Sequence, residues 1–260
     1  MSLKKENLLK LFDFIQEVSE LKGNEWFKDK LTNKYSAHNA SADINDPAIA
    51  KIYEYCIKEI IQKQAETFYK DFKLLTIKHQ LVSDFVRMEH FRRDDNFEDF
   101  CLAIHQQLEA IINYLCTDKL DFCNRIILDK NKSCYKIKNK EKNFWEEFKL
   151  WQLIISTYKT QLDADKLFNQ QLIMWEYPLK LKAVIYYYCF SQKIWDFYKF
   201  KEYNDLANEV YQSRNLNHRG GFQYETQKQL TDKIKNESHK YYFKFLGFLE
   251  DFTSKINSVL

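Results

Sequence analysis

The chain has 260 residues, of which 45% are hydrophobic and 17% aromatic, so it can bury one large core or two smaller ones. This composition excludes a disordered protein. Four glycines and two prolines cannot supply the tight turns of all-β or doubly wound α/β folds, so we predict an all-α, multi-helix bundle. Neither G-x-G-x-x-G nor G-x-x-x-x-G-K-[ST] occurs, which excludes Rossmann and P-loop nucleotide enzymes. The net charge of +3 tolerates an anionic partner without requiring one.

The cysteines indicate a reducing compartment. Six are present at irregular spacings without a C-x-x-C pair, so neither a zinc knuckle nor a redox pair is predicted, and no metal or cofactor is expected. Three disulfides in a secreted chain are the alternative, but the N-terminus lacks an apolar signal region. The longest apolar run, Ala183 to Phe190, is much shorter than the roughly 20 residues that span a bilayer. We therefore expect a cytoplasmic protein without a membrane segment.

Helical periodicity organises the first part of the chain. An amphipathic helix is predicted from Glu6 to Leu21, and a short second helix around Trp26 to Leu31. Ser36 to Pro47 has the composition of a loop. Asp46-Pro47 then fits an N-cap with proline at the first helical position, which opens a long helix reaching Phe68.

The next elements follow a polar break at Arg92 to Asn96. A helix from Phe97 to Leu115 shows the clearest apolar face in the chain. Lys130 to Lys142, with six lysines and one glutamate, is interpreted as an exposed basic loop, the alternative being a patch that contacts phosphates. Aromatic helices are predicted at about 143–161 and 164–200, with a break near Pro178. A helix from Glu202 ends before Gly220-Gly221, and the last runs from Tyr224 to Ile256.

The segment from Tyr211 to Gly221 carries the candidate chemistry. On a helix, Arg214 and His218 share a face about one turn apart, and Asn215, Asn217 and Arg219 add polar groups nearby. If the glycine pair ends this helix, His218 lies in its last turn, where carbonyl dipoles raise the pKa of an imidazole. A guanidinium that grips phosphate oxygens beside an imidazole that moves protons suits chemistry on a phosphodiester. RNA supplies its own nucleophile, the 2′-hydroxyl.

Three segments of the chain resemble the HEPN superfamily, all-α domains found in RNases of CRISPR, abortive-infection and toxin-antitoxin systems. Phe97 to Leu115, with His-Gln-Gln-x-x-Glu, is similar to an early HEPN helix. Arg214-Asn215 followed by His218 resembles the family's Arg-Asn-x-x-x-His signature, with three intervening residues where four to six are usual. Tyr242 to Phe252 is similar to the final aromatic helix. The resemblance covers a HEPN-like domain at 94–260 and leaves 1–93 as an N-terminal helical region of unknown role.

The resemblance implies a metal-independent endoribonuclease of prokaryotic defence or stress response that leaves a 2′,3′-cyclic phosphate. Arg214 would bind the scissile phosphate and His218 would act as general acid or base. Asn215 would position the motif or contact the phosphate, and Asn217 and Arg219 would bind the phosphate or the rest of the RNA. The implied partners are single-stranded RNA, a second copy in a homodimer, and an antitoxin or defence-system protein.

Other interpretations remain open at this point. A catalytically inactive HEPN-like protein would bind RNA or a protein partner through the same surface, and a helical interaction module would ignore nucleic acid. Arg214 and His218 would in that case merely cap a helix end. His105 is interpreted as a satisfied histidine at the boundary of an apolar face, and most aromatic residues as core rather than base-stacking platforms.

Overall fold

The computed structural model describes residues 14, 15, 17, 18, 47–139, 141, 143–155, 159–190, 195–214, 216 and 225–260. The chain divides into two compact units, Met1–Lys63 and Gln64–Leu260. In the first unit, Phe14-Ile15 and Glu17-Val18 are helical, in agreement with the predicted first helix. The short second helix and the Ser-Asn-Asp loop that were predicted next lie outside the described residues.

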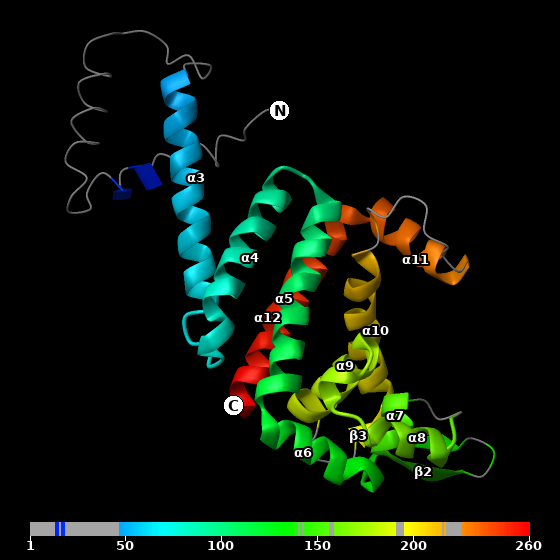
Figure 1. The fold of residues 1–260 in the computed structure, drawn as a ribbon. Helices are drawn as coiled ribbons and strands as arrows, with labels where there is room; N and C mark the ends of the chain where they lie inside the picture. Colours follow the sequence, from blue (N-terminus) through cyan, green and yellow to red (C-terminus); the bar gives the residue numbers. More distant parts are fainter. Residues whose placement is uncertain are drawn as a thin grey trace, which may run out of the picture. The chain divides into compact units, whose positions relative to one another are not determined.

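Three long helices follow in chain order. They are α3 (Pro47–Phe68), α4 (Leu75–Arg93) and α5 (Phe97–Asp118). As predicted, α3 begins at its proline, and a break separates α4 from α5. Asn96 caps α5, because its side chain accepts a hydrogen bond from the Asp99 backbone N–H. The helices α4 and α5 then pack side by side (Figure 1).

The basic segment is a β-hairpin, so the prediction of a loop there was wrong. After α6 (Leu120–Leu128) and the 3₁₀ turn η1 (Asp129–Asn131) come β1 (Ser133–Asn139) and β2 (Phe144–Lys149), which pair antiparallel. A two-residue strand, β3 (Trp195–Asp196), pairs parallel to β1 and completes the order β2-β1-β3. Tyr135 is buried and stacks on Phe148, and this apolar face of the hairpin is what holds it to the helices.

The two aromatic helices predicted for 143–200 are several shorter elements. They are α7 (Leu150–Ile155), α8 (Gln161–Phe168), η2 (Leu172–Met174), α9 (Tyr177–Val184), the π-helical η3 (Ile185–Phe190) and α10 (Phe197–Ser213). Thr160 and Asp163 form a capping box that starts α8. Pro178 lies in the first turn of α9, where proline begins a helix rather than kinking it. The final helix is also divided, into α11 (Glu225–Asn236) and α12 (Ser238–Val259).

Helix α5 forms the centre of the unit 64–260. It packs against α4, α9, α10 and α12, and its predicted apolar face is buried, from Ile104 to Leu115. Phe97 and Phe100 meet Tyr242 of α12 edge to face. The described residues form the all-α, multi-helix bundle that composition predicts, with one small sheet added.

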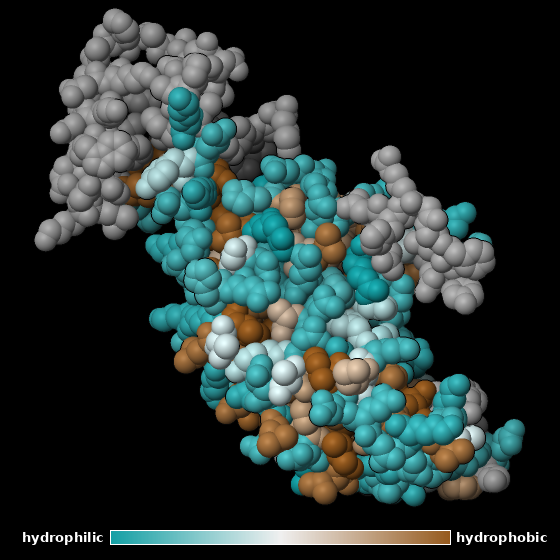
Figure 2. Space-filling model, viewed as in Figure 1, coloured by the Kyte–Doolittle hydropathy of each residue, from teal (hydrophilic) through white to brown (hydrophobic). Residues whose placement is uncertain are grey.

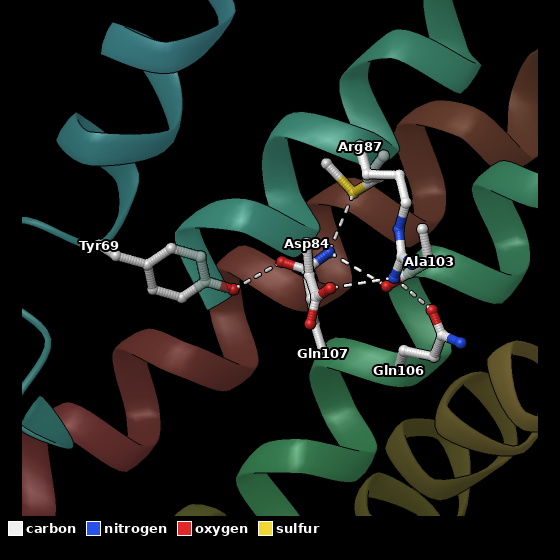
Figure 3. Close-up of polar contacts among 7 residues, drawn as sticks. Tyr69, Asp84, Arg87, Ala103, Gln106 and Gln107 are labelled. Atoms are coloured by element: carbon white, nitrogen blue, oxygen red, sulfur yellow. Dashed lines mark hydrogen bonds and ion pairs between the residues drawn. The ribbon is translucent and has the colours of Figure 1, made fainter. Parts of the chain in front are cut away.

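A polar network crosses the interface between α4 and α5 (Figure 3). Gln107 is fully buried, and its side-chain oxygen accepts a hydrogen bond of 2.8 Å from the Tyr69 hydroxyl. Its amide nitrogen donates to the Ala103 carbonyl at 3.2 Å and to the Met88 sulfur at 3.5 Å. A buried amide is thereby satisfied on both of its ends.

The surface, the helix lengths and the cysteines complete the description of the fold. The face shown in Figure 2 is mostly hydrophilic, with hydrophobic residues scattered over it. None of the helices in the described ranges is both long and apolar enough to cross a lipid bilayer. All six cysteines are free, and four are buried.

Candidate functional site

Arg214 is the only predicted site residue within the described ranges. Helix α10 ends at Ser213, and Arg214 occupies the turn that follows. Asn215, Asn217, His218 and Arg219 lie outside the described residues. The expectation that one helix carries Arg214 and His218 to Gly220 was wrong, because α10 stops before both. His218 therefore does not lie in the last turn of α10.

Packing against α5 fixes the end of α10. Ser213 is fully buried, its hydroxyl donates to the Val210 carbonyl at 2.7 Å, and it also bonds to the thiol of Cys101 on α5. The Leu216 N–H then donates to the Ser213 carbonyl at 3.1 Å, which closes a turn around Arg214. Arg214 thus directly follows a buried residue, Ser213, and precedes a partly buried one, Leu216.

The side chain of Arg214 lies on the ring of Tyr211. Its guanidinium carbon is 3.7 Å from the ring centroid, and one of its nitrogens donates to the Tyr211 hydroxyl at 3.0 Å. The residue is partly exposed, and within the described part of the chain it forms no ion pair. No described residue other than Tyr211 accepts a hydrogen bond from this guanidinium, so with respect to that part of the chain its other N–H groups can bind an anion.

A partly buried aromatic cluster lies beneath this arginine. Tyr211 stacks on Tyr177 of α9, with ring centroids 4.9 Å apart and planes 15° apart. His105 of α5 contacts both rings, at 5.0 Å from Tyr177 and 5.7 Å from Tyr211. Three helices, α5, α9 and α10, therefore contribute to the cluster on which Arg214 stacks.

Two polar atoms in the cluster have no hydrogen-bond partner among the described residues. They are Nε2 of His105 and the hydroxyl of Tyr177. His105 is only 3% exposed, so the expectation of a satisfied boundary histidine was wrong. Unpaired buried polar groups cost free energy, and they concentrate where a protein uses them.

His105 and Tyr177 are both neutral at physiological pH. Burial first, and then the positive charge of Arg214, lowers the pKa of His105 to about 4. Burial and the neighbouring carboxylate of Glu109 raise the pKa of the Tyr177 hydroxyl. Arg214 thus lies near an imidazole and a phenol that are neutral and can offer hydrogen bonds to an anion, whereas the carboxylate of Glu109 next to Tyr177 opposes anion binding.

A polar groove of about 390 Å³ runs along α4 and α5 next to this cluster. Arg87 crosses it, donating to Asp84 at 2.9 Å and to Gln106 at 2.5 Å (Figure 3). Glu109 also lines the groove and acts electrostatically on Tyr177, so the groove borders the aromatic cluster. Burial raises the pKa of Asp84, although Arg87 opposes this.

Sequence reasoning missed the two tyrosines and underestimated His105. Tyr211 precedes Arg214 by three residues, a spacing that brings side chains together on a helix and was open to prediction. Tyr177 has no such signal, because only tertiary packing brings α9 to α10. No group of three or more histidines, cysteines or carboxylates in the described residues is arranged to hold a metal ion.

Comparisons with known proteins add no family. No protein-family model matches the chain, and neither a curated protein nor a solved structure is detectably similar to it.

Proposed function

We propose that the protein is a HEPN-like endoribonuclease that binds an RNA phosphate at Arg214 and cleaves the strand without a metal ion. The observation that carries the proposal is Arg214 itself: an arginine without an ion-pair partner in the described residues, held on Tyr211 above two buried, unpaired polar groups. An arginine fixed by stacking is well suited to grip the two non-bridging oxygens of a phosphodiester.

The packing of the three segments that resemble HEPN domains supports this proposal. Helix α5 contains the first, the end of α10 leads into the second, and α12 contains the third. Both α10 and α12 pack on α5, and α10 also contacts α12 (Figure 1). Segments distant in sequence thus form one core, with Arg214 at its edge.

The proposed reaction is an internal transesterification. The RNA 2′-hydroxyl attacks the adjacent phosphorus and loses its proton, while the 5′-oxygen leaves and gains one. The products are a 2′,3′-cyclic phosphate and a 5′-hydroxyl. Arg214 stabilises the charge that develops on the phosphate, and His218 moves the protons. His105 remains neutral in the free protein because of its low pKa, so its proposed contribution is a hydrogen bond rather than a proton.

Cleavage of a labelled single-stranded RNA in EDTA tests the proposal. We expect the wild type to give cyclic-phosphate ends, and His218→Ala to lower the rate by about 10²–10⁴-fold, the usual contribution of general acid–base catalysis. Arg214→Ala is expected to abolish cleavage, because it removes the group that binds the phosphate. Arg93→Ala is the matched control, because Arg93 is exposed and ends α4. Equal losses in all three variants would contradict the assignment.

A second candidate is a HEPN-like protein that binds RNA without cleaving it. It is favoured by the end of α10 at Ser213, since the helix does not align Arg214 with His218. Salt-sensitive RNA binding that survives His218→Ala, together with a wild type inert in EDTA, would select this candidate. Absence of RNA binding at any salt concentration would instead select a helical interaction module.

The biological setting of the proposal comes from the resemblance alone. It comprises a cytoplasmic protein of prokaryotic defence or stress response, a homodimer with a groove built from two copies, and an antitoxin or other defence protein as partner. A mass measurement in solution by light scattering tests the dimer directly. A monomeric mass at the protein concentration of the cleavage assay would contradict a groove built from two copies.

A further inference from the structure

The β-hairpin presents a face to solvent that the proposed site at Arg214 does not use. Side chains alternate along each strand, so Lys136 and Lys138 of β1 share a face with Trp145, Glu147 and Lys149 of β2. We call these five residues the Lys–Trp face. Tyr135 and Phe148, on the opposite face, pack together in the core. The hairpin is therefore anchored by one side and open on the other.

Trp145 is the aromatic centre of this face. Its side chain is 47% exposed, although a tryptophan usually buries most of its large surface. Lys138 is its direct partner in the register, and the ammonium group of Lys136 lies 6.0 Å from its ring. One surface of the indole therefore remains open beside two positive charges.

The charges of the hairpin indicate the partner. Lys130 to Lys149 contains seven lysines against three glutamates, an excess greater than the +3 of the whole chain. Lys130 and Lys132 are paired with Asp165 and Asp129, but among the described residues Lys136 and Lys138 form no ion pair. Unpaired lysines around an exposed indole match a polyanion that carries flat, apolar rings.

We infer that the Lys–Trp face binds single-stranded nucleic acid, with a base stacked on Trp145 and backbone phosphates at Lys136 and Lys138. Base–aromatic stacking combined with lysine–phosphate contact is the general chemistry of sequence-tolerant single-strand binding. Glu147, which faces Lys136 across the strands, opposes this binding by repelling a phosphate. The choice of RNA over DNA rests on the proposed function, whereas the face itself requires only a single strand.

The hairpin and Arg214 lie at opposite ends of α10. The strand β3, which pairs with β1, directly precedes the first residue of α10, and Arg214 directly follows the last (Figure 1). A helix of this length, 17 residues, spans about 25 Å. The Lys–Trp face is therefore a separate site that holds the strand at a distance from the proposed cleavage point.

Binding of a non-cleavable 2′-O-methyl oligonucleotide tests the inference on the full chain. We expect Trp145→Ala to weaken binding roughly 5- to 150-fold, the range for loss of one stacked base, and Trp145→Phe to retain most of it. Lys136→Gln with Lys138→Gln should reduce the slope of log K against log salt by about 1.4, as expected for two phosphates. Glu147→Gln should strengthen binding.

Matched controls separate the face from a general effect of charge. The double variant Lys58→Gln/Lys63→Gln removes the same charge as the Lys136/Lys138 variant, but from exposed positions on α3. Its oligonucleotide affinity should stay within about twofold of the wild-type value, because only the net charge of the protein changes. Circular dichroism checks that each variant is folded. Wild-type affinity in both Trp145→Ala and the Lys136/Lys138 double variant, or no binding by the wild type, would overturn the inference. Binding of an acidic peptide instead of the oligonucleotide would also overturn it.

The outcomes for the two sites are distinguishable. If the wild type does not cleave RNA but its oligonucleotide binding depends on Trp145, the inference about the Lys–Trp face is supported and the proposed nuclease activity is contradicted. If the wild type cleaves RNA and the cleavage does not change in the Trp145, Lys136 and Lys138 variants, the proposed nuclease activity is supported and the inference about the Lys–Trp face is contradicted.

Discussion

The charge of a single histidine is decided by where its helix is packed. His105 faces the core from the centre of α5, where it has lost its water and meets the positive charge of Arg214. Both effects disfavour the imidazolium form, so the residue is neutral over the whole physiological range. Tyr177 is held in its neutral form beside it, because burial raises its pKa.

This makes folding stability depend on pH. The pKa of His105 is about 4 in the folded protein and about 6.5 in the unfolded chain, so the unfolded chain binds the extra proton between these values. The contribution of neutral His105 to the free energy of unfolding is therefore fully present above about pH 6.5, and it is lost as the pH decreases toward 4. We expect the wild type to lose about 2–3 kcal/mol more than His105→Gln between pH 7.5 and 4.5, measured by urea unfolding. Parallel losses in the two proteins would contradict the assignment.

The buried pair of Tyr69 and Gln107 gives a second prediction for individual residues. Tyr69→Phe leaves the Gln107 oxygen without a donor, and Gln107→Leu leaves the Tyr69 hydroxyl without an acceptor. Each substitution should cost about 1–3 kcal/mol, while the double variant should cost less than their sum, since it removes both polar groups. A double-mutant cycle by urea unfolding measures this, with the exposed Gln64→Leu as control. Strict additivity would show that the hydrogen bond contributes nothing.

Helices whose ends are marked by local residues such as proline or an N-cap could be predicted from the sequence. Strands that form only by pairing with another segment could not. Helix α3 begins at its proline and α5 follows the predicted break, because local sequence determines both starts. The hairpin was missed since Phe144 and Phe148 are four residues apart, a spacing that puts them on one face of a helix and equally on one face of a strand. Pairing with β1 decided between the two, and pairing is not local. For the same reason the stacking of Tyr211 on Tyr177 could not be predicted from the sequence.

The N-cap of α5 is expected to stabilise the whole protein. Asn96→Ala removes the acceptor for the Asp99 N–H and should cost about 1 kcal/mol. Asn96→Ser keeps an oxygen at the cap and should restore most of that stability. Because α5 is the central helix, we expect the loss to appear in the global unfolding transition. A midpoint unchanged in Asn96→Ala would show that the end of α5 frays without affecting the core.

At the scale of the molecule, the division into two units governs what can fold independently. The main hydrophobic cluster of the described residues begins at Ala65 and extends to Ile256, so it lies entirely in the unit 64–260. Helices α4 and α5 share this unit, whereas the resemblance begins only at 94. The assignment of separate roles to 1–93 and 94–260 remains a prediction.

We therefore expect the fragment 64–260 to unfold cooperatively without the first 63 residues. Its 197 residues are enough to bury a hydrophobic core of their own, and they contain all of the main cluster. Calorimetry should give one transition whose calorimetric and van't Hoff enthalpies agree, and the fragment should retain the oligonucleotide affinity of the full chain. A fragment that starts at Asp94 is the contrasting case, because it lacks α4 and exposes the buried face of α5. Cooperative folding of that shorter fragment would favour a boundary at 93 over one at 63.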